Sequence, residues 1–189
     1  MPMEVEAVIE RVAEFQRSKY FGKHRGLVAD IDDPDRLGRI RAEVPSVFGE
    51  ALTPWAMPCV PYAGPSHGLA LIPEVGDGVW IEFEGGNLKS PIWSGCWWAD
   101  GQRPTPDGNL ARLLATSGGH QVLIDEDADE IKLVHPGGGE LVIGSDKITI
   151  SIGQAEIKLT SSEVVINSGM VKVTTSGASL VNDAFKVGG

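Results

Sequence analysis

The sequence predicts an all-β protein in which a small barrel precedes a repetitive β-rod, with one short helix at the N-terminus. Three observations carry this prediction. Apolar and polar residues alternate in short runs over most of the chain, 24 Gly and 12 Pro separate these runs, and a helical period is confined to residues 3–19. Short alternating runs bounded by Gly and Pro are typical of strands joined by tight turns.

The N-terminal segment 3–19 has the spacing of an amphipathic helix. Acidic residues come early in it and basic residues late, as the helix dipole favours. Its apolar side chains recur three or four positions apart and therefore share one face; they are Val5, Val8, Ile9, Val12 and Phe15. Since the segment has no core of its own, we expect this face to dock on another surface.

Residues 20–104 have the pattern of short strands and turns. The runs GLVADI and GRIRAEV flank an Asp-rich turn at 32–35, and the runs WAMPCVPY, GLALIP, DGVWIEFEGG and PIWSGCWW follow. In that turn Pro34 fixes φ and Gly38 permits a bulge or a close approach. Five or six short antiparallel strands on one small core predict a closed or nearly closed barrel. The segment GQRPTPDGNL at 101–110 predicts a linker.

From Gly119 onward one pattern repeats: an apolar pair on a short strand, then a polar turn. Successive pairs begin 9, 10, 7, 9, 7 and 7 residues apart, which leaves no room for helices. The two residues of a pair share one face of their strand. We expect these pairs to form the core of the rod; they are Val122, Ile124, Ile131, Leu133, Leu141, Ile143, Ile148, Ile150, Ile157, Leu159, Val164, Ile166, Val171 and Val173.

An isolated strip of such strands exposes an apolar face and unpaired backbone edges. A single chain could wind about 70 residues into a triangular coil of about three turns. Alternatively, three copies could each contribute one wall of a closed prism. The periodicity leaves both arrangements open, and the thinness of the apolar strip favours the trimer.

Composition excludes several classes of function. A net charge of −10 argues against non-specific nucleic-acid binding and against docking to an anionic membrane. The two cysteines, Cys59 and Cys96, have apolar neighbours, which predicts reduced, buried thiols. No stretch is apolar enough to span a bilayer, and residues 1–20 lack the apolar core of a signal peptide. We therefore expect synthesis in the cytoplasm.

The motifs that could carry chemistry predict no active site, no cofactor site and no metal site. Two acidic clusters lack the Gly and Glu positions of an EF-hand loop and predict solvated turns; they are Asp30/Asp32/Asp33/Asp35 and Asp125/Glu126/Asp127/Asp129/Glu130. Ser66-His67 and Ser117/His120 lack a nucleophile-elbow pattern, and Gly137–Gly139 predicts a turn rather than a phosphate loop. Five tryptophans could stack bases, although few basic residues accompany them.

Motifs of the barrel region occur in a characteristic order: YFGK at 20–23, GLV at 26–28, DPDRLGRIR at 33–41, PWAMP at 54–58, PEVGDGVWIEF at 73–83, GGN at 85–87 and SPIWSG at 90–95. Their order and spacing resemble the OB-fold of the phage baseplate assembly protein V family, relatives of the VgrG spike of type VI secretion. The resemblance implies an OB-fold barrel at 20–104. It also implies a homotrimer whose segments 105–189 form an intertwined triple-stranded β-helix.

The resemblance further implies a function and partners. The protein would be a non-enzymatic central spike in the baseplate of a phage-tail-like particle, attached to a tail hub and driven mechanically through the target membrane. Because the chain begins close to the barrel, we expect a separate hub protein, with residues 1–19 as its contact. Phage tail, tailocin, type VI-like system and extracellular injection particle remain open, and the alternative is an OB-fold module that binds nucleic acid or oligosaccharide.

One departure from the family concerns the tip. Some short members end in a His-x-His pair that, in threefold symmetry, binds iron. The histidines of this chain stand elsewhere, at His24, His67, His120 and His135. We therefore expect no tip metal, and a separate PAAR-type tip protein covering the C-terminal end.

Overall fold

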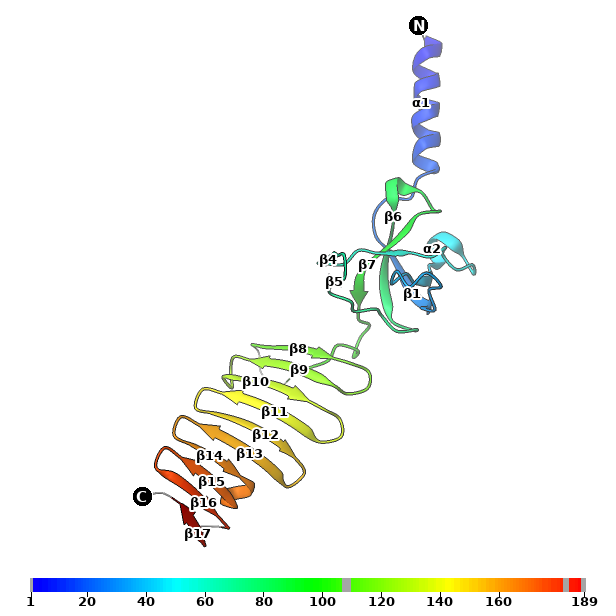
Figure 1. The fold of residues 1–189 in the computed structure, drawn as a ribbon. Helices are drawn as coiled ribbons and strands as arrows, with labels where there is room; N and C mark the ends of the chain where they lie inside the picture. The colour runs from blue at the N-terminus through cyan, green and yellow to red at the C-terminus, as the bar shows by residue number, and fades with distance from the viewer. Residues whose placement is uncertain (1, 107–109, 182–183, 188–189) are drawn as a thin grey trace. The chain divides into compact units, whose positions relative to one another are not determined.

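A computed structural model of the chain describes residues 2–106, 110–181 and 184–187. The chain divides into two compact units, Met1–Arg103 and Pro104–Gly189. Apart from short helices, both units consist of strands and turns (Figure 1), which confirms the all-β prediction. Of the linker expected at 101–110, residues 107–109 lie outside the described residues.

The first unit contains a five-stranded sheet in the order β2-β1-β6-β7-β3. Its strands are β1 (His24–Asp30), β2 (Arg41–Glu43), β3 (Met57–Pro58), β6 (Gly78–Phe83) and β7 (Pro91–Trp97). A separate hairpin pairs β4 (Ala63–Gly64) with β5 (His67–Gly68). The helical elements are α1 (Pro2–Arg17), α2 (Pro45–Phe48) and the single turn η1 (Glu84–Gly86).

This sheet closes around a small core of side chains at most 6% exposed. Alternate positions of β6 point into it, because successive side chains of a strand face opposite sides. Tyr20, Phe48 and Leu88 pack against its margin. The core residues are Val28, Ile40, Ala42, Val44, Ala56, Val79, Ile81, Phe83 and Trp93. The unit therefore buries its apolar residues within a single chain.

Two details of the barrel differ from the sequence prediction. The run GLALIP was expected to be a strand, but residues 69–74 lie in no strand, and Leu69, Leu71 and Ile72 are 41–51% exposed. We also expected antiparallel strands throughout, whereas β3 pairs parallel to β7. Hydrophobic alternation does not encode strand direction, which the connection through α2 determines here.

The second unit is a ten-stranded antiparallel sheet in which each strand pairs with the next one along the chain. Figure 1 shows this meander running from β8 to β17. Its strands are β8 (Ala111–Ala115), β9 (Gln121–Asp125), β10 (Glu130–Val134), β11 (Gly139–Gly144), β12 (Lys147–Ile152), β13 (Ala155–Thr160), β14 (Glu163–Ile166), β15 (Val171–Thr174), β16 (Gly177–Leu180) and β17 (Phe185–Val187), with the turn η2 (Asn167–Gly169) between β14 and β15.

The meander decides between the two arrangements that periodicity left open. A single-chain triangular coil stacks each strand on one from the next turn of the coil, so that neighbouring strands are separated by two others in sequence. Here consecutive strands are hydrogen-bonded neighbours throughout the sheet. One chain therefore forms a single sheet rather than a triangular coil, and tight turns join its strands. At the turn after β10, for example, Gly138 has φ +88°, a conformation that suits glycine.

Candidate functional site

The register of the second sheet aligns its apolar residues into two continuous columns. Directly opposed residues of neighbouring strands share one face of a sheet. One column begins at Leu114 in β8 and runs through Val122, Leu133, Leu141, Ile150, Ile157, Ile166, Val171 and Leu180 to Phe185. The other runs through Ile124, Ile131, Ile143, Ile148, Leu159, Val164, Val173 and Ala178 to Val187. We call the two columns the apolar ladder.

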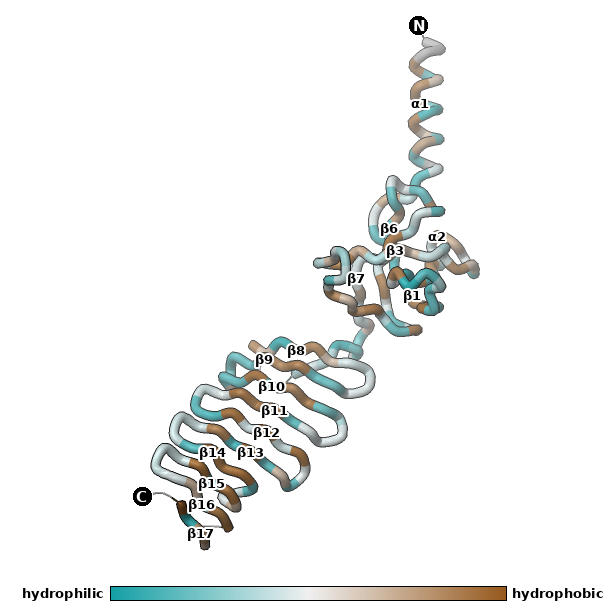
Figure 2. Tube along the Cα trace, in the orientation of Figure 1, coloured by the Kyte–Doolittle hydropathy of each residue, from teal (hydrophilic) through white to brown (hydrophobic). Residues whose placement is uncertain are grey.

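All fourteen residues predicted for the core of the rod lie in this ladder. Figure 2 shows the corresponding brown segments recurring from strand to strand, with paler or teal turns between them. The pattern of pairs did not include the ends of the ladder, namely Leu114, Ala178, Leu180, Phe185 and Val187. At these ends the pairs are weaker, since Arg112 in β8 stands opposite Ile124 and the small Ala178 in β16 stands opposite Val173.

The ladder is open in the single chain. Nine of its fourteen predicted residues are 37–49% exposed, among them Ile150 at 49% and Leu133 at 45%. A shallow hollow of about 630 Å³ lies along it, lined by Leu133, Leu141, Ile150, Ile157 and Ile166 together with flanking residues. Monomeric proteins rarely expose a continuous apolar strip of this length. The ladder therefore has the character of a surface that another chain covers.

The opposite face of the same sheet is mixed in character. Lysines alternate there with apolar and hydroxyl residues in the central column, which runs through Leu113, Leu123, Lys132, Val142, Thr149, Lys158, Val165, Lys172, Ser179 and Lys186. Val165 and Ser179 are 8% and 9% exposed. The Lys132 ammonium lies 2.8 Å from the Glu130 carboxylate. Hydrogen bonding to Glu130 raises the pKa of Lys132. The two faces of the sheet therefore differ in charge, since the lysines stand on this face and the ladder residues on the other.

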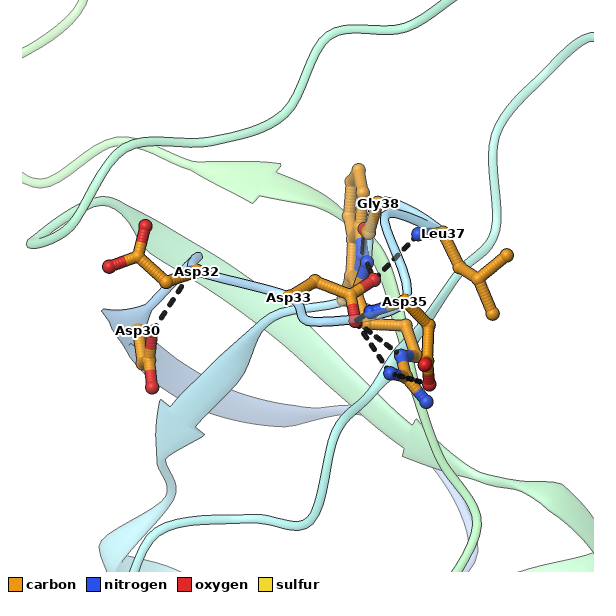
Figure 3. Close-up of polar contacts among 8 residues, drawn as sticks. Asp30, Asp32, Asp33, Asp35, Leu37 and Gly38 are labelled. Atoms are coloured by element: carbon orange, nitrogen blue, oxygen red, sulfur yellow. Dashed lines mark hydrogen bonds and ion pairs between the residues drawn. The ribbon is translucent and has the colours of Figure 1, made fainter.

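One polar cluster of the first unit lies in the turn that follows β1 (Figure 3). Both carboxylate oxygens of Asp33 are used: Oδ2 accepts the backbone N–H of Leu37 at 2.7 Å and of Arg39 at 3.2 Å, and Oδ1 accepts that of Asp35 at 3.1 Å. The Arg39 guanidinium donates to Oδ1 through Nε at 3.0 Å and Nη2 at 2.5 Å. This carboxylate closes the turn.

The contacts of this turn assign it a structural role. The Arg39 side chain holds the pKa of Asp33 far below its usual range, with help from the backbone donors. The side chain of Asp33 is only 5% exposed, so this acid of the cluster is buried rather than solvated as expected. Next to it, the Trp93 indole N–H donates to the Gly38 carbonyl oxygen at 3.0 Å, which ties the turn to the core.

The second acidic cluster is also a turn. Asp125, at the end of β9, is 8% exposed, and its Oδ1 accepts the backbone N–H groups of Asp127 and Ala128 at 3.0 and 3.1 Å. Glu126 forms an ion pair of 2.7 Å with Arg112. In the described part of the chain, no group of three or more His, Cys, Asp or Glu side chains is arranged to hold a metal ion.

The aromatic side chains of the barrel carry arginines on their faces. The Arg25 guanidinium lies 5.5 Å from the Trp80 ring centre and 5.1 Å from that of Trp97. Arg39 and Arg41 lie 5.8 and 5.9 Å from the ring centre of Trp55. Stacking of nucleobases or sugars needs free ring faces. These intramolecular contacts compete with the alternative interpretation of the barrel as a nucleic-acid or oligosaccharide module.

The histidines make structural contacts. His24 packs beside Phe83, with ring centres 5.5 Å apart, and its buried Nε2 has no hydrogen-bond partner. His120 and His135 come from neighbouring turns of the second sheet, and their rings meet edge to face at 4.9 Å. His67 Nδ1 lies 2.9 Å from the Pro65 carbonyl oxygen. None of these contacts has the form of a nucleophile paired with its base.

The cysteine prediction was wrong in one respect. Cys59 and Cys96 are free thiols, as expected, but both are exposed. Cys96 lies on β7, where the side chains of Pro91 and Trp93 point into the core. The position of Cys96 in the strand places it outside, and apolar neighbours in sequence do not reveal this.

The helix α1 keeps its apolar stripe uncovered. Val5, Val8, Ile9, Val12 and Phe15 are 51–61% exposed. Neither described helix is long and apolar enough to cross a membrane. Assignment of the stripe to a tail hub stays a prediction.

Comparison with known protein families agrees with this architecture. A family model described as the type VI secretion system/phage-baseplate injector OB domain matches residues 24–98. A second, described as the phage baseplate V C-terminal trimerisation domain, matches residues 111–172. The first covers the barrel, and the second covers most of the ladder. A search of curated proteins finds no match.

The fold and these matches define a structural protein of a phage-type baseplate. The chain belongs to the baseplate V family of VgrG-like spike proteins, which confirms the resemblance seen in the sequence. Members of this family are structural proteins of the baseplate that assemble into phage-tail-like particles.

Proposed function

We propose that the protein is the central spike of a contractile injection apparatus and that it works as a homotrimer without catalysis. The observation that carries this proposal is the apolar ladder: an open strip along ten paired strands, in a segment that matches a trimerisation domain. Three copies place their ladders against one another around a threefold axis. The lysine-bearing faces of the three sheets then form the outside of a prism.

Energetics support the closed prism. Complete burial of a Val, Leu or Ile side chain contributes about 1.5–3 kcal/mol. The nine ladder residues that are still 37–49% exposed therefore offer several kcal/mol per chain on assembly. A rod closed in this way has backbone hydrogen bonds along each wall and an apolar core, which resists bending under load.

The proposed mechanical role follows from that rigidity. When a sheath contracts, the rod transmits force to the target envelope and pierces it. In this proposal residues 1–19 face a separate tail hub, residues 20–104 form the OB-fold collar, and residues 105–189 form the linker and the spike. A PAAR-type tip protein covers the C-terminal end, where Phe185 and Val187 are about 60% exposed. This mechanical role would suit any of the four machines that the sequence leaves open: a phage tail, a tailocin, a type VI-like system or an extracellular injection particle.

A charge placed in the ladder tests the proposal. Ile150→Asp brings three carboxylates to the axis of the prism, where they have no partners and are desolvated. We expect this variant to sediment as single chains, whereas the unaltered protein sediments as a trimer. The matched control is Thr149→Asp on the adjacent residue, which points to the lysine-bearing face, and it should remain trimeric.

Two results would contradict the proposal. If Ile150→Asp stays trimeric, the ladder is not the interface. If Ile150→Asp and Thr149→Asp dissociate equally, the two faces of the sheet do not differ as described. Circular dichroism checks that the sheet stays folded in both variants, and tryptophan fluorescence checks the first unit, because all five tryptophans lie there.

A further inference from the structure

The apolar ladder by itself says little about how three copies should be aligned along their axis. From β9 to β15 both columns consist of Val, Ile and Leu alone, and every second strand runs in the same direction. If one copy slid along the others by one hairpin, about 9–10 Å, aliphatic side chains would again meet aliphatic side chains. Two strands at one end would lose their cover, and the other eight of the ten would keep it. Apolar packing tolerates such exchanges of similar side chains.

One residue in line with the ladder breaks this equivalence. Arg112 on β8 stands directly opposite Ile124 and therefore continues the second column. Among the strands that the structure describes in the second unit, it is the one charged residue that the pairing places in either column. Because β8 is the first of the ten strands, this charge marks one end of the ladder.

The side chain of Arg112 is held by two contacts within its own chain. Its Nη1 lies 2.7 Å from the carboxylate of Glu126, the residue that follows β9, and donates to the Leu110 carbonyl oxygen at 2.7 Å. The Arg112 and Glu126 side chains are 60% and 52% exposed, so both keep much of their hydration. Burial of an ion pair in an apolar core costs more hydration than the attraction of the two charges returns. This pair is therefore stable at the end of the ladder and would be costly within it.

We propose that Arg112, held by Glu126, sets the alignment of the three copies, an inference that rests on the proposed trimer. Under threefold symmetry each residue lies at the same height as its two counterparts. Three Arg112–Glu126 pairs, with no net charge together, then lie at the open end of the ladder. Sliding by one hairpin in either direction carries the Arg112 of one copy to the level of Ile131 and Leu133 of another, where its charge is desolvated. The aligned trimer is the one arrangement that leaves every pair at the end.

Loss of threefold symmetry is the result that tests this inference. In an aligned trimer the three copies are equivalent, so each isoleucine methyl group of the deuterated, methyl-labelled protein gives one NMR signal. Arg112→Leu removes the charge and extends the ladder by one aliphatic residue. We expect this variant to sediment as a trimer in which ladder residues such as Ile131 and Ile150 give at least two signals each. Ile40 and Ile81, buried in the barrel core, should keep one signal each.

Two matched controls separate this inference from the proposed function. Arg112→Lys keeps the charge in the same column, and Lys132→Leu removes a charge from the opposite face of the sheet; both should remain symmetric trimers. An Arg112→Leu trimer with one signal per ladder isoleucine would show that Arg112 does not set the alignment, and the ladder interface would still stand. Extra signals in Lys132→Leu would also overturn the inference, because any lost charge would then suffice. A single-chain mass of the unaltered protein overturns both proposals.

Two further variants keep the test decisive if Arg112→Leu forms no soluble trimer. Arg112→Thr also removes the charge but leaves a small polar side chain, and its ladder isoleucines should again give extra signals. One signal per isoleucine in that variant would contradict the inference. Exchange of the pair, Arg112→Glu together with Glu126→Arg, returns two opposite charges to the same height and should give a symmetric trimer. Extra signals in the exchanged variant would show that a charged pair at this end does not align the copies.

Discussion

The two units of this protein differ in how far a single chain buries their apolar side chains. The barrel buries nine apolar residues to 6% exposure or less within one chain. The ten-stranded sheet gathers at least as many on one face and leaves nine of the predicted core residues 37–49% exposed. Both consist of short alternating strands. The difference is that the apolar side chains of the first unit meet in one buried cluster, whereas those of the second unit line one face of a single sheet.

This contrast explains why one unit is self-sufficient and the other depends on assembly. A closed barrel has an inside, whereas a single-layer sheet has only two faces. Since lysines interrupt the apolar residues of one face and the ladder of the other face is continuous, the ladder is the face suited to form a core. The contrast predicts that the stability of the barrel is independent of protein concentration and that the stability of the sheet rises with it.

The largest expected effect comes from the barrel core. Ile81 is fully buried, so Ile81→Ala should destabilise the first unit by about 2–5 kcal/mol. The loss should appear in urea unfolding followed by tryptophan fluorescence, which reports the first unit alone, and it should be the same at low and high protein concentration.

The matched variant in the ladder is Ile131→Ala, at a position 43% exposed in the single chain. It should leave the fluorescence transition unchanged and lower the unfolding transition of the sheet, followed by circular dichroism, most strongly in dilute protein. If Ile131→Ala shifted the fluorescence transition as much as Ile81→Ala does, the two units would not be energetically separate.

A smaller, pH-dependent effect should come from the Asp-rich turn. The pKa of Asp33 is lowered in the folded state, chiefly by Arg39. Its carboxylate therefore stabilises the folded barrel above the ordinary aspartate pKa of about 3.9, and this contribution is lost as the pH falls below that value. Asp33→Asn should lower the thermal midpoint of the first unit by about 5–10 °C at pH 7 and flatten its decline in acid.

The control for the turn is Asp32→Asn, since Asp32 is exposed and lies in the same cluster. It should change the midpoint little at either pH. An Asp33→Asn variant with the same midpoint and the same acid response as the unaltered protein would show that this carboxylate does not hold the turn.

The sequence predicted the ladder well because the period of two determines which face of a strand each residue occupies. Pairing of consecutive strands then places their apolar residues opposite one another. It predicted β8 and β16 less well, since β8 has Arg112 in place of an apolar residue and β16 has only the small Ala178. The exposure of Cys96 and the parallel pairing of β3 depend on tertiary placement, which local alternation does not encode. The buried state of Asp33 depends on Arg39, six residues away.

The mass of the protein in solution, compared with that of a chain ending at residue 103, decides whether the ladder is the interface of a trimer. We expect three times the chain mass of 20.1 kDa for the full-length protein and a single-chain mass for the shortened one. A full-length protein that sediments as a folded single chain would contradict the account, because the ladder would then be stable without a partner.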